Sequence, residues 1–433
     1  MADDLAEEIA VLARRICTEN ISNDTLELLW ASRLVPLLKT DGGVRPVGIG
    51  EVIRRIIGKS LLKLLGEDIQ LAAGTLQACT GVESGIEAAI HTMYDTFQEE
   101  WCEGVLLVDA DNAFNNLNIE VALNSIEHNC PQIHQFIVNS YKKPTKLFLN
   151  DGSYILSQEG VTQGDPLAMA IYVLASRKLI DALSNVSDEV KQVWFADDNS
   201  DAGTIEGLHL VWNKLNEIGP LFGYFPKASK TVLVVKSEAD LKKAEELFAE
   251  EKITITCKGE RHIGAALGAE EFKRTFVELK VEKWIEDVRK LAKFAESEPQ
   301  AALSSYNTGL SQRWTFLQRT VQGIGYLFEP LENSIKEELI PAIIGRKISE
   351  LERRICALPY RYGGLGIIDP TQSAERQYKA SRKITAPLTK LMLEQNMDLA
   401  LLNKDDVKDR KNEVTAEREK ELAGIRKYLP CVG

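Results

Sequence analysis

The fold is decided at Val193-Trp194-Phe195-Ala196-Asp197-Asp198-Asn199-Ser200, where two adjacent carboxylates follow a short apolar run. Apolar residues on both sides of a tight polar pair predict a β-hairpin with the acids at its tip. Two like charges at a buried tip are costly unless a cation neutralises them. Mg²⁺ does this by combining one or two protein carboxylates with substrate phosphates. The alternative interpretation is a solvated Asp197-Asp198 pair in a loop.

The composition is that of an ordinary globular protein. The chain has 433 residues, of which 44% are hydrophobic and 27% are charged, enough apolar material for a large core with two or three subdomains. No apolar run is long enough to cross a bilayer, and the acidic beginning Met1-Ala2-Asp3-Asp4 is unlike a signal peptide. We therefore expect no membrane partner.

The cysteines indicate a reducing compartment. All seven stand singly without a CxxC pair, so we expect free thiols in an intracellular protein, with nucleus and cytoplasm undistinguished. His128, Cys130 and His134 are close in sequence, but their surroundings look like a helix end, which favours packing over metal binding.

The charge of the whole chain argues against a protein that holds nucleic acid mainly through phosphates. Its net charge is −12 and its pI is about 5.2. Charge is also local, however, since residues 33–63 contain seven basic residues (33, 39, 45, 54, 55, 59 and 63) and two acidic ones (41 and 51). A basic channel is compatible with this distribution.

A hairpin is predicted between Leu34 and Ile49, because two apolar runs flank an Asp-Gly-Gly turn. Lys39 and Arg45 would project from its neighbouring strands. Two cations on a hairpin suit a triphosphate, since Arg offers a bidentate fork and Lys a point charge. Two solvated surface cations are an equally supported interpretation.

Two further stretches carry candidate chemistry. The run Gly104–Val108 predicts a buried strand, and Asp109 stands where that strand ends, in a position to serve a ligand or metal. An Asp that caps the following turn is the alternative, and it fits Asp111 better than Asp109. In Gln163-Gly164-Asp165-Pro166 a glycine loop opens a helix, which lets a base pair or sugar approach the backbone. Gln163 offers a donor and an acceptor there.

The remainder of the chain changes character at about residue 270. Lys230 precedes a predicted strand, and short strands follow over 253–268. Beyond them the sequence predicts long helices over 271–296, 298–327 and 329–357.

Taken in order, these segments resemble the reverse transcriptases of the non-LTR retroelement and group II intron kind over roughly residues 30–270. The family's motifs are matched by Arg45-Pro46-Val47, Asp109-Ala110-Asp111-Asn112-Ala113-Phe114, Gly160-Val161-Thr162-Gln163-Gly164-Asp165-Pro166, Phe195-Ala196-Asp197-Asp198 and Gly223…Lys230-Thr231. His262…Gly268 resembles the primer-grip region more loosely. The order and spacing are far more specific than any single motif.

The chain departs from the family pattern in places. Asn115 stands where many relatives have Asp, although the residue that matches the catalytic Asp of this motif is Asp109. Viral RNA-dependent RNA polymerases usually carry Gly before the Asp pair and a Ser-Gly second motif. Ala196 and Gln163-Gly164 therefore favour DNA synthesis.

The resemblance implies an α+β right-hand polymerase fold. We expect an N-terminal helix and fingers over 1–103, a palm over 104–270, an all-α thumb over 271–400 and a charged tail over 401–433. Since endonuclease, RNase H and zinc-knuckle segments are not visible in the sequence, we expect further domains in a longer retroelement polyprotein.

The resemblance also implies a mechanism and its residues. The activity would be extension of a DNA primer on an RNA template with dNTPs. Asp109, Asp197 and Asp198 would hold two Mg²⁺ ions, with Mn²⁺ as an alternative. Binding of the nucleotide would involve Lys39, Arg45, Ala110, Phe114, Gln163 and Gly164. Phe114 would exclude a 2′-hydroxyl, and Lys230 would protonate pyrophosphate, unless it is a surface lysine.

Two alternative functions stay open at this point. One is a catalytically silent, domesticated relative that binds nucleic acid, against which the intact set of three aspartates argues. The other is an RNA-dependent RNA polymerase, which nucleotide preference would distinguish.

Overall fold

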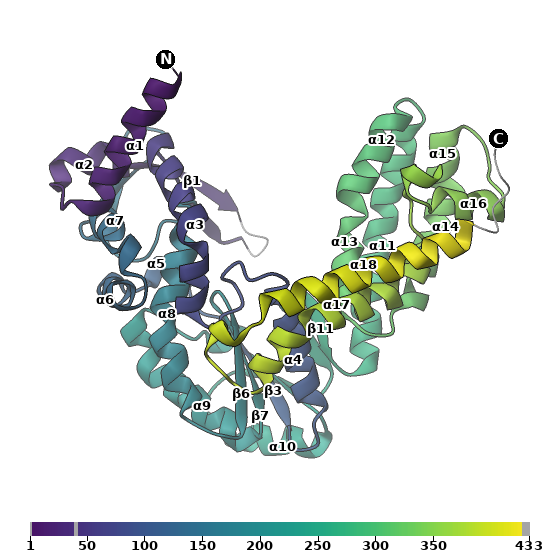
Figure 1. The fold of residues 1–433 in the computed structure, drawn as a ribbon. Coiled ribbons are helices and arrows are strands. Elements are labelled where there is room, and N and C mark those ends of the chain that lie inside the picture. Colours follow the sequence, from purple (N-terminus) through teal and green to yellow (C-terminus); the bar gives the residue numbers. More distant parts are fainter. Residues whose placement is uncertain (1, 39–41, 427–433) are drawn as a thin grey trace. The chain divides into compact units, whose positions relative to one another are not determined.

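The computed structural model describes residues 2–38 and 42–426 (Figure 1). Lys39 and Asp41 of the predicted turn therefore lie outside the described residues. The fold is mixed α+β and divides into two compact units. The first unit comprises Met1–Leu233, Ser237–Ile255 and Leu391–Leu401, and the second comprises Val234–Lys236, Thr256–Lys390 and Leu402–Gly433. The boundaries of fingers, palm and thumb stay predictions.

The helices that begin in the first unit are α1 (Ala2–Thr18), α2 (Asn23–Trp30), α3 (Val52–Ala73), α4 (Gly85–Gln98), α5 (Ala113–Asn116), α6 (Ile119–Asn129), α7 (Pro131–Tyr141), α8 (Ala168–Ser184), α9 (Ile205–Ile218) and α10 (Glu238–Leu247). The strands that begin there are β1 (Ser32–Leu38), β2 (Val44–Gly50), β3 (Gly104–Val108), β4 (Thr145–Phe148), β5 (Tyr154–Ser157), β6 (Val190–Phe195), β7 (Asp198–Gly203), β8 (Val232–Val235) and β9 (Thr254–Thr256).

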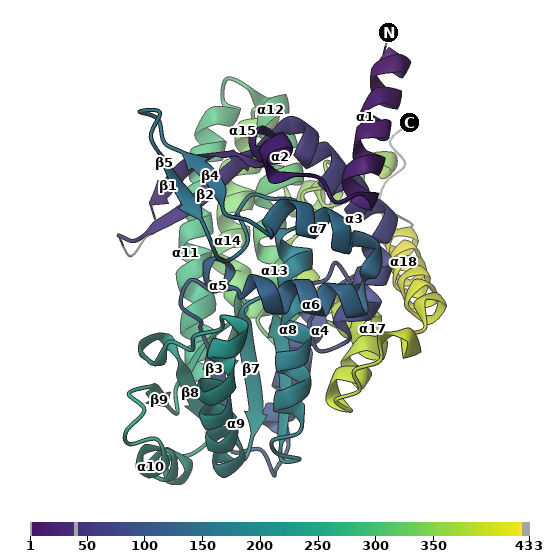
Figure 2. The ribbon, with the colours of Figure 1, turned by 90° about the vertical axis from the view of Figure 1, so that its left-hand side faces the viewer.

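A five-stranded sheet with the order β6-β7-β3-β8-β9 carries the candidate site. Strand β3 lies at its centre and is buried over almost its whole length, as its apolar run predicts. It pairs antiparallel with β7, which pairs with β6 in a hairpin. Helix α9 packs on β3 and β7 (Figure 2), and α4 packs on β6 and β7. The predicted hairpin around the adjacent aspartates is thus confirmed.

A second sheet has the order β2-β1-β4-β5. The hairpin predicted between Leu34 and Ile49 is confirmed by the antiparallel pairing of β1 with β2, and β4 and β5 form a second antiparallel hairpin. Strand β4 joins the first hairpin by a short parallel pairing with β1. Strand β2, which carries Arg45, therefore lies at one edge of this sheet.

The second unit is mainly helical. It contains the hairpin β10 (Gly259–His262) and β11 (Ala265–Gly268), together with α11 (Glu270–Ala295), α12 (Pro299–Ser305), α13 (Gln312–Thr320), α14 (Glu329–Ser334), α15 (Ile340–Ile344), α16 (Glu350–Cys356), α17 (Pro370–Leu393, whose last residues belong to the first unit) and α18 (Lys404–Arg426). In the described part of the chain no helix combines the length and the apolar character needed to cross a membrane.

The predicted continuous helices over 298–327 and 329–357 are wrong. The first is interrupted by a π-helical turn at Tyr306–Leu310 and ends at Thr320, before Gly323, which has a φ of 74°. The second ends at Gly345, whose φ of 84° suits glycine, and α16 starts again with Ser349 as its N-cap. The apolar period continues through both breaks, which is why the pattern hides them.

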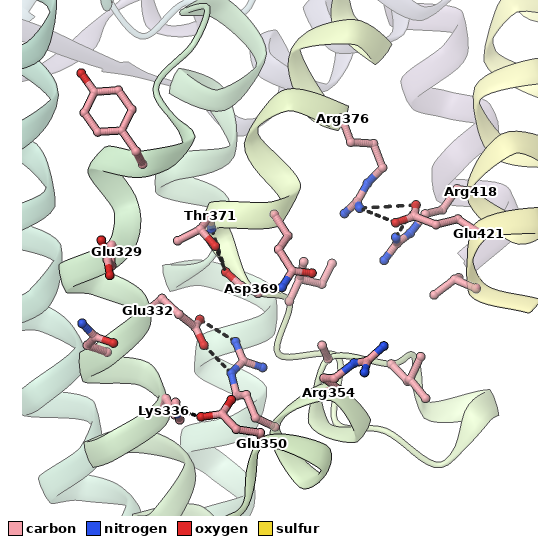
Figure 3. Close-up of a pocket in the computed structure, with 18 residues that line it drawn as sticks. Glu329, Glu332, Lys336, Glu350, Arg354, Asp369, Thr371, Arg376, Arg418 and Glu421 are labelled. Atoms are coloured by element: carbon pink, nitrogen blue, oxygen red, sulfur yellow. Dashed lines mark hydrogen bonds and ion pairs between the residues drawn. The ribbon is translucent and has the colours of Figure 1, made fainter. Parts of the chain in front are cut away.

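A pocket of about 480 Å³ opens in the second unit among α14, α16, α17 and α18 (Figure 3). Its charged lining is largely paired within the pocket. Both side-chain oxygens of Glu332 accept hydrogen bonds from Arg353, each at 2.6 Å, and Glu421 accepts from Arg376 at 3.2 Å and from Arg418 at 2.8 Å. These ion pairs fasten the helices of this unit to one another.

Candidate active site

The end of β3 and the tip of the β6–β7 hairpin bring two of the predicted aspartates together. Val108, the last residue of β3, pairs with Asn199 of β7, so that Asp109 follows beside the hairpin tip. Burial is the largest cause of a raised pKa at Asp197, and the charge of Asp109 raises it further. Arg45 acts in the opposite direction and lowers that pKa. Asp109, Asp197 and Arg45 therefore share one electrostatic environment.

Asp198 is the first residue of β7 and is exposed. Its charge acts on the same neighbourhood as that of Asp197. Burial, followed by Asp197 and Asp198, raises the pKa of the Cys79 thiol to about 11. The same causes in the same order raise the pKa of Tyr172 well above its ordinary value. Both side chains thus stay protonated beside the aspartates near neutral pH.

The donor set of this site suits a hard divalent cation. Carboxylate oxygens are the ligands that Mg²⁺ prefers, and burial and the charge of Asp109 raise the pKa of Asp197 against the opposing effect of Arg45. Within residues 2–38 and 42–426, no three His, Cys, Asp or Glu side chains gather closely enough to form a metal site by themselves. This also applies to His128, Cys130 and His134. An ion at Asp109 and Asp197 would need oxygen ligands from its substrate or from water.

Two lysines face the carboxylates that follow β3. The Nζ atom of Lys230 lies 3.8 Å from Asp109 Oδ2, and both side chains are nearly half exposed. Lys227, which the sequence did not single out, pairs with Asp111 at 2.6 Å, and its backbone N–H donates to the carbonyl of Asp109. Lys230 ends a short 3₁₀ turn just before β8, at the predicted place. The carboxylate of Asp111 thus forms an ion pair with Lys227. The backbone carbonyl of Asp111 accepts a hydrogen bond from the side chain of Asn116.

Phe114 stacks on an aromatic ring that the sequence did not assign to the site. Its ring lies 4.5 Å from that of Tyr172 on α8, with an angle of 19° between the planes. The carbonyl of Phe114 accepts a hydrogen bond from the N–H of Val161 at 2.7 Å. Ala110 is buried and pairs with Pro226 as an isolated bridge. The stretch after β3 is therefore fixed on two sides.

The Gln163-Gly164 loop lies against strand β2. The N–H of Gly48 donates to the carbonyl of Gln163 at 2.7 Å. Gly164 has a φ of 109°, and a Cβ atom there would come within 2.5 Å of the Gly48 carbonyl oxygen. Glycine is thus required by the close approach of the two backbones.

A buried ion pair anchors the same loop to α3. Arg54 pairs with Asp165, and both side chains are less than 5% exposed. The hydroxyl of Tyr141 donates to the same carboxylate at 2.8 Å, and the guanidinium of Arg54 lies over the rings of Trp30 and Tyr141. Asp165 thus serves to position the loop.

Removing the charge of Asp165 should therefore destabilise the first unit. In Asp165→Asn, Arg54 is left buried without its counter-charge, which costs about 3–5 kcal/mol. Urea unfolding followed by circular dichroism measures this loss. In the matched control Asp181→Asn the pair with Arg177 is partly exposed, so we expect less than about 1 kcal/mol. Equal losses in the two variants would contradict the anchoring role.

A second buried acid lies in β7, beyond the hairpin tip. Asp201 is fully buried, and burial raises its pKa to about 7, against a smaller opposing effect of the hydrogen bond from Asn199. Asn199 Nδ2 donates to Asp201 Oδ1 at 3.3 Å, whereas Asn199 Oδ1 and Asp201 Oδ2 have no hydrogen-bond partner. A neutral Asp201 carboxyl supplies a donor to this pair, which the charged form lacks.

This pair predicts a pH-dependent stability. The folded-state pKa of Asp201 is raised from about 3.8 to about 7. The stability that the neutral Asp201 carboxyl contributes to the folded protein is therefore fully present below pH 4 and is lost as the pH rises through 7. Asp201→Asn stays neutral, so its stability relative to wild type should increase between pH 4 and 8, by up to about 4 kcal/mol.

Thermal unfolding at several pH values tests the expectation. The control Asp151→Asn removes an exposed acid whose pKa is lowered, chiefly by a hydrogen bond from Ser153. Asp151 titrates below the tested range, so this variant should follow wild type there. A constant difference between Asp201→Asn and wild type across the range would refute the prediction.

No protein-family model and no curated protein matches the chain. Among solved structures it is similar to the telomerase of Candida albicans in complex with a TWJ fragment of telomeric RNA, with 12% identity, a TM-score of 0.47 and coverage of 95% of this chain and 70% of that one. It is also similar to the apo telomerase of Candida tropicalis, with 12% identity, a TM-score of 0.44 and coverage of 94% and 73%.

The same telomerase truncated from its C-terminal domain matches with 14% identity, a TM-score of 0.37 and coverage of 48% of this chain and 50% of that chain. The chain therefore spans half of that relative.

The sequence did not indicate four residues that lie around the site, namely Gln77, Tyr172, Tyr224 and Lys227. The hydroxyl of Tyr224 donates to the Asp197 carbonyl at 3.0 Å, and its ring packs on Trp194. Lys227 and Tyr224 stand close to Lys230 in sequence, which is a signal that could have been used. Gln77 carries no such signal, because it lies in a loop of small residues far from the aspartates in sequence.

Proposed function

We propose that the chain is an RNA-directed DNA polymerase that extends a DNA primer on an RNA template with dNTPs. One observation carries the proposal. The Asp109 carboxylate at the end of a central buried strand acts on Asp197 at the tip of the neighbouring hairpin, with Arg45 and Lys230 as nearby cations. Carboxylates from separate strands that need a cation suit phosphoryl transfer.

In the proposed reaction the 3′-hydroxyl of the primer gives its proton to water, and its oxygen forms a bond to the α-phosphorus of a dNTP. The bond from that phosphorus to the bridging oxygen of the β-phosphate breaks, and pyrophosphate leaves. Asp109 and Asp197 would hold the Mg²⁺ ions, with Asp198 beside them and oxygens of the substrate or of water as further ligands. When bound, Mg²⁺ lowers the pKa of the attacking hydroxyl and offsets the charge on the phosphates.

Cationic side chains would complete the charge balance. Arg45 would bind the triphosphate through its guanidinium fork, together with Lys39. Lys230 would give the proton on Nζ to the leaving pyrophosphate. Its ammonium group lies 3.8 Å from Asp109, so it is already held beside the carboxylates.

The nucleotide itself would lie between Phe114 and the Gln163-Gly164 loop, with Ala110 nearby. Stacking on Tyr172 fixes the plane of the Phe114 ring, and a fixed ring can exclude a 2′-hydroxyl on steric grounds. Gln163 has donors and an acceptor for the nascent base pair. The template–primer would be recognised by its backbone and shape, without sequence readout.

Primer extension on an RNA template with dNTPs and Mg²⁺ tests the proposal. Asp197→Asn should lower the rate by roughly 10³-fold, because a metal ligand is worth several kcal/mol of transition-state stabilisation. The control Asp151→Asn changes an aspartate at another hairpin turn, between β4 and β5, and should extend primers like wild type.

Other outcomes would change the role given to Asp197 or the proposed function. Extension that persists in Asp197→Asn would remove Asp197 from the mechanism. A folded wild type that binds template–primer but extends nothing would overturn the polymerase proposal in favour of a silent nucleic-acid-binding relative. A preference for rNTPs would instead indicate an RNA polymerase.

The sugar pocket makes a separate prediction. Phe114→Ala should raise the use of rNTPs relative to dNTPs by about 10–100-fold, since removal of the ring opens space for a 2′-hydroxyl. Single-nucleotide incorporation with each nucleotide measures the ratio of kcat/KM values. Phe148→Ala removes an exposed aromatic ring from β4 and serves as the control, with an unchanged ratio. An unchanged ratio in Phe114→Ala would exclude this residue as the sugar gate.

A further inference from the structure

The turn that carries Asp197 has an unusual backbone. Phe195 pairs with Asp198, so Ala196 and Asp197 alone close the β6–β7 hairpin. Ala196 is buried and has a φ of 57°, in the left-handed region that favours glycine. A residue with a Cβ atom keeps such a conformation only when its surroundings impose it.

The side chain of Gln77 supplies that constraint. Its Oε1 accepts a hydrogen bond from the N–H of Ala196 at 2.8 Å, and its Nε2 donates to the carbonyl of Ala196 at 3.1 Å. One side-chain amide therefore fixes the peptide groups on both sides of Ala196. Only one orientation of the amide satisfies both bonds, since its oxygen must face the N–H and its nitrogen the carbonyl.

Gln77 is itself held firmly. Its neighbours Leu76 and Ala78 form backbone hydrogen bonds of 2.7 Å with Trp194 of β6, so this short segment pairs in parallel with the strand. The residue is 1% exposed, and its Nε2 also lies 3.5 Å from the hydroxyl of Ser176 on α8. The side-chain amide of Gln77 is thus held in a fixed position relative to β6.

We propose that Gln77 is a positioning residue, which holds Ala196 in the left-handed conformation and thereby directs the Asp197 carboxylate toward Asp109. The catalytic meaning of this role rests on the polymerase function proposed above. Tyr224 bonds the carbonyl of Asp197, so Gln77 fixes the peptides before the acid and Tyr224 the peptide after it. Together they fix the backbone on both sides of this one carboxylate.

The first test replaces Gln77 with an apolar side chain of similar length. In Gln77→Met we expect amide hydrogen exchange in the segment 195–199 to be at least about tenfold faster than in wild type, because the bonds to Ala196 are lost. This measurement does not depend on activity. Unchanged exchange there would overturn the proposal, whether or not the chain extends primers.

The matched control is Gln192→Met. Gln192 is a buried glutamine of β6, and its amide bonds the Ile180 carbonyl, the Ser184 hydroxyl and the Trp194 indole, none of which belongs to the turn residues 196 and 197. Both variants should lose several degrees of melting temperature. Only Gln77→Met should speed exchange in the segment 195–199.

Kinetics then separate positioning from stability. Gln77→Met should lower kcat for primer extension by about 10–100-fold with KM for the dNTP within about twofold, since the reacting groups are misplaced while nucleotide contacts remain. Gln192→Met should retain its kcat. Equal kcat values in both variants would reduce Gln77 to a stabilising residue.

A compensating substitution gives the sharpest test. Glycine adopts a positive φ without a steric penalty. The double variant Gln77→Met/Ala196→Gly should therefore have a kcat about tenfold higher than Gln77→Met alone, whereas Ala196→Gly by itself should change the kcat of the wild type little. Absence of any rescue would show that the conformation of Ala196 is not what Gln77 controls. If wild type itself extends no primer, the polymerase function fails, and the exchange measurement still decides the role of Gln77.

Discussion

Two carboxylates are held beside each other at the end of a buried strand, and the candidate site is arranged around their repulsion. Asp109 and Asp197 come from different strands of one sheet, and burial adds to the cost of their charges. Such a pair persists only when hydrogen bonds fix the backbone and cations stand nearby. Gln77 and Tyr224 fix the turn, while Arg45 and Lys230 supply positive charge.

Two ion pairs of the first unit differ in burial and therefore in their roles. Arg54 and Asp165 are buried and fully engaged with each other, so their pair positions the Gln163-Gly164 loop and leaves no charge for a ligand. Asp109 and Lys230 are nearly half exposed and only 3.8 Å apart. Such a pair can be opened by a phosphate or a metal ion at small cost, because exposed ion pairs contribute little.

The outer edge of β6 shows how this sheet avoids an open edge. No strand pairs with it there in the described sheet, yet the backbone of residues 76–78 bonds Trp194. Further along, the amide of Gln395 accepts from the N–H of Gln192 at 2.9 Å and donates to its carbonyl at 3.2 Å. The backbone of residues 76–78 and the side chain of Gln395 thus act where a neighbouring strand would, which protects the edge.

The sequence by itself determined the local elements, namely the hairpins and the buried strand before Asp109, because turn residues and apolar periods are encoded over a few positions. It also indicated the aspartates and Arg45. Tertiary structure alone decided the breaks in the helices of the second unit and the pairing of Asp165 with Arg54. It also decided the role of Gln77, which stands 119 residues before the turn it holds. The partner of a buried polar group follows from long-range packing, which no local pattern records.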